Sequence, residues 1–245
     1  MSAGGALRRA AVVFDLDGTL VDSRLDFAAL REEVRALLAA RGLPWLGLSS
    51  HEPALAELLT WARDHASGAA PAAYAEAMAR VEAAERVGHA ARAMPGAAPV
   101  LRRLRAAGAR LGVLTNNARA GSIAQMQRLG LDALVDVVVT RDDVPALKPD
   151  PRGLAMTFAR LDDRSVRFFV GDSWIDAAAA QALGVPFVAL GLAPDVVAGH
   201  GLAPVAWHAG SLDEALRVIE QAAAAAAKDG QAPPGQREGR ACRDG

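Results

Sequence analysis

The chain of 245 residues has little cysteine, no excess of charge of one sign and no long apolar run. Its single cysteine, Cys242, lies in a polar stretch and cannot form an intramolecular disulfide, so we expect a cytoplasmic protein. The formal net charge of −1 argues against nucleic-acid and anionic-membrane partners. No apolar run approaches the roughly 20 residues of a transmembrane helix. The short run after Arg8 and Arg9 ends in aspartates, which indicates a buried strand and not a secretory signal.

Lysine is also scarce. Of the 27 lysine and arginine residues, only Lys148 and Lys228 are lysines. Arginine has replaced lysine almost everywhere else. A lysine retained at 148, directly before Pro149, suggests a need for a compact point charge there. Taken alone, however, such a residue is typical of the solvated surface.

Short apolar runs alternate with helical patterns over much of the chain. The predicted strands are Ala10–Asp15, Arg110–Thr115, Leu134–Thr140, Arg167–Gly171, Val185–Leu190 and Pro204–His208. The predicted helices between them are Ala97–Ala107, Arg119–Leu129, Pro151–Leu161 and Trp174–Leu183. This alternation predicts an α/β fold, with a doubly wound parallel sheet covered on both faces.

Residues 23–92 interrupt the alternation and read as a small all-helical insert after the first strand. One helix follows Ser23 as its N-cap and ends near Ala40, and the other two span about Glu52–His65 and Pro71–Arg92. The core is then 1–22 and 93–220. The alanine-rich stretch and polar mixture of 221–245 predict a fraying helix end and a disordered tail.

Unusual polar residues stand at the carboxyl ends of the predicted strands, which is the edge where open parallel sheets bind ligands. The pair Asp15 and Asp17 is the most informative, because carboxylates so close repel each other unless a cation or divided roles separate them. The other polar residues at strand ends are Thr115, Asn116, Asn117, Lys148, Gly171, Asp172, Ser173 and Asp176.

Each of these residues has a structural explanation when taken alone. Asp15 and Asp17 could form a solvated turn, and Thr115 could be a β-branched strand residue. Asp172 and Asp176 could be a helix N-cap and a first-turn acid. These explanations require four coincidences in the right order, so we prefer a catalytic site. The five histidines show no metal-ligand spacing.

The ordered set resembles the motifs of the haloacid dehalogenase superfamily. The motifs are Asp15-Leu-Asp17-Gly-Thr19, Leu114-Thr115-Asn116, Lys148-Pro149 and Gly171-Asp172-Ser173-x-x-Asp176. Pro95-Gly96 and the run Lys148-Pro149-Asp150-Pro151 are similar to the branch of phosphoglycolate phosphatases and β-phosphoglucomutases. The resemblance covers about residues 10–220, and it implies a Rossmann-like core with a helical cap inserted after the first motif.

The resemblance also implies a mechanism that uses Mg²⁺. Asp15 and Asp172 would ligate the ion, together with the backbone carbonyl of Asp17, and Asp176 would hold a metal-bound water. Asp15 would attack phosphorus and form an aspartyl-phosphate, while Asp17 would act as general acid and then as general base. The phosphate oxygens would be neutralised by Lys148, the Thr115 hydroxyl and the Asn116 backbone amide.

The leading hypothesis is therefore a Mg²⁺-dependent phosphatase for a small organic phosphate monoester, working as a monomer or homodimer. A phosphomutase is the first alternative, although Thr19 favours hydrolysis because the mutases tend to have an apolar residue there. A dehalogenase does not need Asp17, and a retired phosphate-binding regulatory protein would not need the complete set. The cap sets specificity in such enzymes, and its candidates for substrate contact are Arg24, Arg31, His51 and Arg63.

Overall fold

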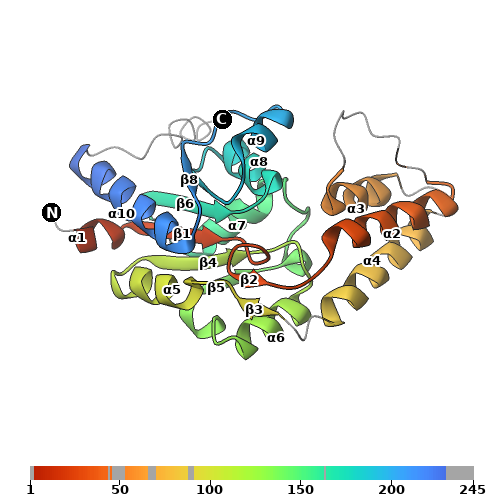
Figure 1. Ribbon diagram of the computed structural model, residues 1–245, viewed down its shortest axis with the longest axis horizontal. Coiled ribbons are helices and arrows are strands. Elements are labelled where there is room, and N and C mark those ends of the chain that lie inside the picture. Colours follow the sequence, from red (N-terminus) through yellow and green to blue (C-terminus); the bar gives the residue numbers. More distant parts are fainter. Residues whose placement is uncertain are drawn as a thin grey trace, which may run out of the picture.

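The computed structural model describes residues 3–43, 45, 53–65, 70–87, 91–162 and 164–229. Its core is a six-stranded parallel sheet in the order β5-β4-β1-β6-β7-β8 (Figure 1). The strands are β1 (Ala10–Phe14), β4 (Arg110–Leu114), β5 (Val137–Val139), β6 (Val166–Gly171), β7 (Phe187–Leu190) and β8 (Trp207–Ala209). The predicted α/β fold with a parallel sheet is confirmed.

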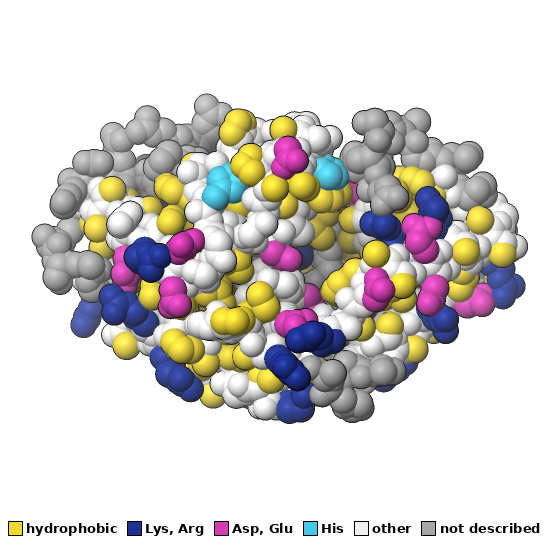
Figure 2. All heavy atoms as spheres, viewed as in Figure 1, with side chains coloured by type: hydrophobic (Ala, Val, Ile, Leu, Met, Phe, Trp, Pro, Cys, Tyr) yellow, Lys and Arg dark blue, Asp and Glu magenta, His cyan; other side chains and the backbone are white. Residues whose placement is uncertain are grey.

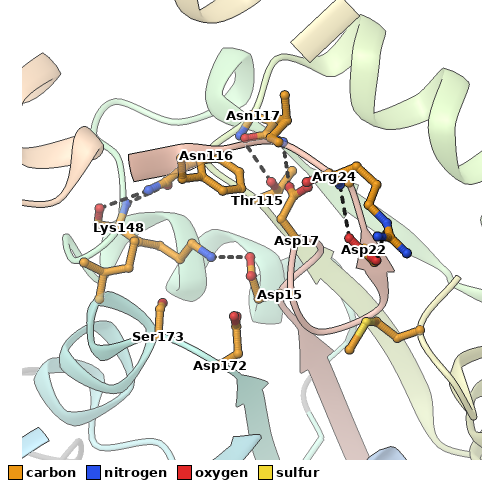
Figure 3. Close-up of a pocket in the computed structure, with 16 residues that line it drawn as sticks. Asp15, Asp17, Asp22, Arg24, Thr115, Asn116, Asn117, Lys148, Asp172 and Ser173 are labelled. Carbon is orange, nitrogen blue, oxygen red and sulfur yellow. Dashed lines mark hydrogen bonds and ion pairs between the residues drawn. The ribbon is translucent and has the colours of Figure 1, made fainter. Parts of the chain in front are cut away.

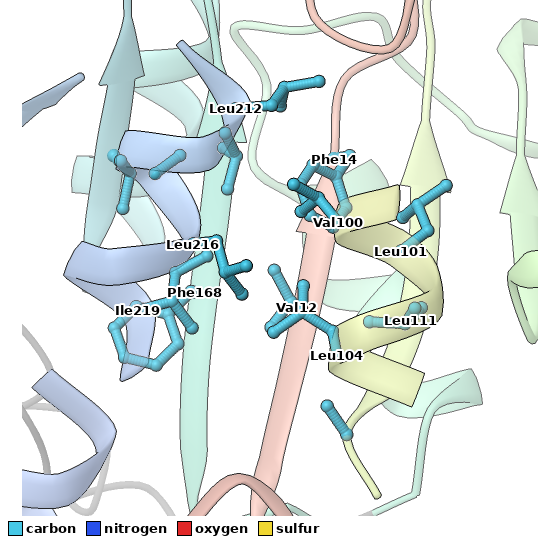
Figure 4. Close-up of a cluster of buried hydrophobic side chains, with 14 of the residues drawn as sticks. Val12, Phe14, Val100, Leu101, Leu104, Leu111, Phe168, Leu212, Leu216 and Ile219 are labelled. Carbon is cyan, nitrogen blue, oxygen red and sulfur yellow. The ribbon is translucent and has the colours of Figure 1, made fainter. Parts of the chain in front are cut away.

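Helices cover both faces of the sheet because side chains alternate along each strand. Val12 and Phe14 of β1 belong to one apolar cluster, in which they pack beside Leu104 and Leu216 (Figure 4). The helices on this face are α1 (Ala3–Leu7), α5 (Ala97–Ala106), α6 (Arg119–Arg128) and α10 (Leu212–Asp229). Val13 faces the other cluster, whose helices are α7 (Arg152–Arg160), α8 (Trp174–Leu183) and α9 (Pro194–Gly199).

Three further helices form a cap with an apolar core of its own. Leu30, Val34 and Leu38 are buried against Leu58 and Val81. The cap helices are α2 (Phe27–Ala40), α3 (Leu55–Asp64) and α4 (Ala70–Val87). Two short antiparallel strands, β2 (Val21–Asp22) and β3 (Arg92–Ala93), pair where the chain leaves the core and where it returns. This ribbon was not predicted, because two-residue strands are too short to show a periodicity of two.

The first cap helix begins later than the sequence predicted. Asp26, not Ser23, is its N-cap, and the Asp26 carboxylate accepts a hydrogen bond of 2.9 Å from the amide of Ala29. The third cap helix ends at Val87 and does not reach Arg92, which belongs to β3. Ser23 is thereby released from a capping role and is buried next to the polar strand ends.

The predicted bounds of the last helix and of strand β5 also differ from the structure. Helix α10 continues to Asp229, so the predicted fraying helix end is regular helix through that residue, and residues 221–229 do not belong to the predicted tail. Alanine favours helix, and the buried Ala223 places this part of α10 in the main apolar cluster. Residues 230–245 lie outside the described residues. Strand β5 has three residues and not seven, and the first residue of the predicted strand, Leu134, belongs to a 3₁₀ turn over Asp132–Leu134.

Within the described ranges, no helix combines the length and the apolar character that a membrane span requires. On the face shown in Figure 2, charged side chains of both signs are interspersed over the core and the cap. That face therefore has no broad basic patch of the kind that binds phosphate backbones.

Candidate active site

The polar strand ends line one cavity of about 590 Å³ next to the cap. Figure 3 shows Asp15, Asp17, Lys148 and Asp172 around it, with Arg24 from the start of the insert. These side chains come from segments that are far apart in the sequence. They meet because β1, β4 and β6 are neighbours whose carboxyl ends lie at the same edge of the sheet.

Asp15 and Lys148 form a buried contact at the base of this cavity. The Lys148 Nζ lies 2.5 Å from Asp15 Oδ1 and 2.7 Å from Asp176 Oδ1, and it donates to the Leu114 carbonyl oxygen at 3.3 Å. Only 4% of Lys148 is exposed. Burial alone would lower the pKa of Lys148, but the charges of Asp15 and Asp176 outweigh burial and raise that pKa above 10.5. Lys148 is therefore a fixed cation.

One ammonium group does not balance the carboxylates around it. Oxygens of Asp15, Asp172 and Asp176 all lie within 4.8 Å of one another. Burial raises the pKa of Asp15 well above 3.8, and burial together with the charge of Asp176 raises the pKa of Asp172 to about 6. An oxygen-only, partly buried carboxylate set is the donor chemistry that Mg²⁺ prefers. The residues present therefore fit such an ion.

Asp17 lies apart from this cluster and in a different environment. Its Oδ2 accepts a hydrogen bond of 2.6 Å from Asn117 Nδ2, whereas its buried Oδ1 has no hydrogen-bond partner among the described residues. Burial raises the pKa of Asp17 to about 6, against opposing hydrogen bonds from Ser23 and Asn117, and the charge of Glu85 adds to the rise. A carboxyl group with a pKa near neutrality can both donate and accept a proton.

The segment after β4 is held by its own side chains. Asn116 Nδ2 donates to the Lys148 carbonyl oxygen at 3.1 Å, and the Lys148 amide donates back to Asn116 Oδ1 at 2.9 Å. The buried Thr115 hydroxyl accepts from the Asn117 amide at 3.1 Å. Asn116 thus fixes the backbone that carries the Lys148 side chain.

Glycine is required where the first strand turns toward Asp172. Gly18 has a φ of +80°, and a Cβ built on it would lie 2.0 Å from Asp172 Oδ2. Next to it, the buried Thr19 hydroxyl donates to Asp172 Oδ1 at 3.2 Å. Asp176 is completely buried, and its Oδ2 accepts a hydrogen bond from the Ser173 hydroxyl. The oxygens of Asp176 are thus already bonded to Lys148 and Ser173.

The residues of the insert that were predicted to contact substrate lie in different places in the structure. Arg24 lines the catalytic cavity, with a left-handed φ of +58° and an ion pair of 2.7 Å to Asp22. Arg31 instead lines a neighbouring cavity of about 310 Å³. Arg63 donates to the Pro145 carbonyl oxygen at 3.1 Å. His51 lies outside the described residues.

Sequence reasoning missed two side chains next to Asp17. Ser23 was interpreted as a hinge or cap residue, and Asn117 had no assigned role. Asn117 donates a hydrogen bond to Asp17, and Ser23 lines the same cavity and opposes the rise of the Asp17 pKa. The pair of consecutive asparagines after β4 was the available signal, because two adjacent side chains on an extended segment point in different directions and can serve two partners.

A parallel sheet covered by helices, with acidic side chains gathered at the strand ends beside a helical cap, defines a capped protein of the Rossmann-like α/β class. The chain belongs to the haloacid dehalogenase-like hydrolase family, which matches residues 10–184. It is 37% identical over 188 residues to a phosphoglycolate phosphatase of Cereibacter sphaeroides, with 72% of this chain and 82% of that protein covered. A phosphoglycolate phosphatase of Caulobacter vibrioides is 33% identical over 192 residues, with 74% and 79% covered.

Solved structures share this fold over most of their length. A hydrolase from Pseudomonas syringae has a TM-score of 0.63 at 22% identity, covering 86% of this chain and 98% of that one. A haloacid dehalogenase-superfamily hydrolase from Geobacter sulfurreducens has a TM-score of 0.54 at 26% identity, covering 86% and 96%. The 86% of the chain that each likeness covers is more than lies outside residues 23–92, so these likenesses include part of the cap.

Proposed function

We propose that the protein is a Mg²⁺-dependent phosphatase that hydrolyses a small organic phosphate monoester through an aspartyl-phosphate on Asp15. The observation that carries the proposal is the division of the two neighbouring aspartates into different environments. Asp15 lies against the Lys148 ammonium within the carboxylate cluster, while Asp17 stands outside it with a pKa of about 6. One carboxylate is thus suited to attack and the other to transfer a proton.

The first step forms a bond from an Asp15 carboxylate oxygen to phosphorus and breaks the bond from phosphorus to the ester oxygen. Asp17, protonated, donates its proton to that leaving oxygen. In the second step Asp17 accepts a proton from water, the water oxygen bonds to phosphorus, and Asp15 is released as a carboxylate. Mg²⁺ held by Asp15, Asp172 and the Asp17 carbonyl, with Asp176 behind them, would neutralise charge on the phosphoryl oxygens.

The relatives supply the first substrate to examine. Two of them are phosphoglycolate phosphatases that are more than 30% identical over most of both chains, so we propose phosphoglycolate as the starting member of a substrate panel. The single cysteine supports a cytoplasmic enzyme, and we expect a monomer or homodimer.

Release of inorganic phosphate from phosphoglycolate and related monoesters, with Mg²⁺ and with EDTA, tests the proposal. We expect turnover that depends on Mg²⁺ and that falls by at least about 10³-fold in Asp15→Asn, because the amide is not a nucleophile. Full activity of Asp15→Asn would contradict the nucleophile assignment. Absence of turnover from the wild-type protein over a broad panel would contradict the function itself.

A further inference from the structure

A buried ion pair joins the cap to the core beside the catalytic cavity. Glu85 of the cap helix α4 meets Arg141, the first residue of a 3₁₀ turn (Arg141–Asp143) that follows β5. Glu85 Oε1 lies 2.9 Å from Arg141 Nη1, and Glu85 Oε2 lies 3.2 Å from Arg141 Nη2. The two side chains are only 5% and 7% exposed. A bidentate pair so well removed from water tolerates little displacement of either partner.

Both members of the pair also hold the turn formed by residues 116–118. Arg141 Nη1 donates to the Asn116 carbonyl oxygen at 3.3 Å, and the Arg141 amide donates to the Asn117 carbonyl oxygen at 3.0 Å. Glu85 Oε2 accepts a hydrogen bond of 3.1 Å from the Ala118 amide, directly before helix α6. Residues 116 and 118 are therefore bonded to the charged groups of the pair, and residue 117 is bonded to the backbone of Arg141.

The same turn carries the side chain that contacts Asp17. Asn117 Nδ2 donates to Asp17 Oδ2 at 2.6 Å, and the other oxygen of Asp17 is left without a partner among the described residues. A displacement of the Asn117 backbone would move this donor and with it the free oxygen. Small displacements of a proton donor cost rate, because the reacting atoms must lie within hydrogen-bond reach.

We propose that Glu85 and Arg141 are positioning residues, which hold the 116–118 turn so that Asn117 keeps Asp17 aimed at the leaving oxygen of the substrate. This inference rests on the proposed phosphatase function. Neither residue lines the catalytic cavity, so their placement reaches Asp17 through Asn117. The charge of Glu85 also raises the pKa of Asp17 directly, and the double variant described below removes this charge together with that of Arg141. Because Glu85 belongs to the cap, the placement of the proton donor depends on the cap being seated on the core.

The test compares two esters that differ in their need for a proton. An alkyl ester such as phosphoglycolate leaves as a strongly basic alkoxide and needs the acid, whereas p-nitrophenyl phosphate leaves as a stable phenolate and needs it little. Since kcat/KM reports the steps through the first release of alcohol, we expect Glu85→Gln to lower kcat/KM by about 30-fold for phosphoglycolate and less than about 3-fold for p-nitrophenyl phosphate. Equal losses for both esters would overturn the proposal.

Arg80→Gln is the matched control, because Arg80 lies on the same helix α4 and pairs with Glu33 at 2.7 Å on the exposed surface of the cap. It should change neither ester by more than about 2-fold. The double variant Glu85→Gln/Arg141→Met removes both buried charges, and it should unfold within a few degrees of the wild type while keeping the selective loss. If it recovers wild-type turnover of phosphoglycolate, the ion pair has no positioning role.

Amide exchange gives a readout that does not depend on turnover. In Glu85→Ala, which lacks the acceptor of the Ala118 amide, exchange at residues 117 and 118 should accelerate at least about 10-fold relative to the Arg80→Gln control. Unchanged exchange there would overturn the inference even in an active enzyme. A wild-type protein that hydrolyses neither ester would instead contradict the proposed function, and accelerated exchange would still show that the pair holds the turn.

Discussion

Replacing the proposed proton donor, Asp17, should abolish turnover and should also stabilise the metal-free protein. The pKa of Asp17 rises from 3.8 to about 6 on folding, chiefly because the carboxyl group is buried. The folded state therefore binds this proton more tightly than the unfolded state, so stability falls as pH rises from about 4 to about 6, and the full cost is present above that window. One pKa unit is worth about 1.4 kcal/mol, and the side chain keeps some contact with water, so ionised Asp17 costs about 2 kcal/mol.

Asp17→Asn removes this titration and leaves an amide oxygen to accept from Asn117. We expect thermal unfolding in EDTA at pH 8 to show Asp17→Asn more stable by about 2 kcal/mol, or about 4–8 °C. At pH 4 the difference should shrink below about 0.5 kcal/mol, because the wild-type carboxyl group is then protonated. Asp195→Asn on the exposed surface should change stability by less than about 0.5 kcal/mol at both values. A gain that is absent at pH 8, or equal at both pH values, would refute the reasoning.

Two further substitutions test the packing beside the site and along the last helix. Gly18→Ala should destabilise by at least about 3 kcal/mol in urea unfolding, because the new Cβ would meet Asp172 at 2.0 Å; Gly42→Ala, with a similar φ of +77° but open space, should cost only about 1 kcal/mol. Similar costs at the two glycines would contradict the contact with Asp172. Ala223→Glu should cost at least about 3 kcal/mol because position 223 is fully buried, whereas Ala225→Glu on the exposed side should change stability by less than about 0.5 kcal/mol. A tolerated charge at 223 would show that α10 does not pack as described.

Local patterns predicted the sheet but not the details that join its parts. The apolar runs identified all six strands because buried parallel strands are apolar nearly throughout. The alanine run after Gln221 was expected to fray, because composition alone does not show that small side chains allow α10 to pack against α1. The ribbon of β2 and β3 has two residues in each strand, so pairing in space, and not periodicity, defines it.

The sequence predicted those residues of the candidate site that stand at the ends of predicted strands. It did not predict contacts between side chains from distant segments. Asp15 and Asp17 follow one predicted strand, and Asp172 follows another. Because the carboxyl ends of parallel strands lie at one edge of the sheet, the sequence predicted that these residues are close in space. The role of Glu85 was not predicted, although a signal was present. Ala73, Ala77 and Val81 recur every four residues and form a buried stripe on α4. Glu85 occupies the next position of this stripe, and a charged side chain on an apolar face requires a buried partner.

Lys148 illustrates how geometry refines a role taken from a motif. Its ammonium group has three N–H donors, and three acceptors already surround it, namely Asp15, Asp176 and the Leu114 carbonyl oxygen. A contact with a phosphoryl oxygen therefore requires that one of these be given up, and the Leu114 carbonyl at 3.3 Å is the weakest. The carboxylate contacts are shorter and charge-assisted, so we expect Lys148 to keep Asp15 ionised and oriented throughout the reaction. Its contribution to phosphate binding then comes from its charge more than from a new hydrogen bond.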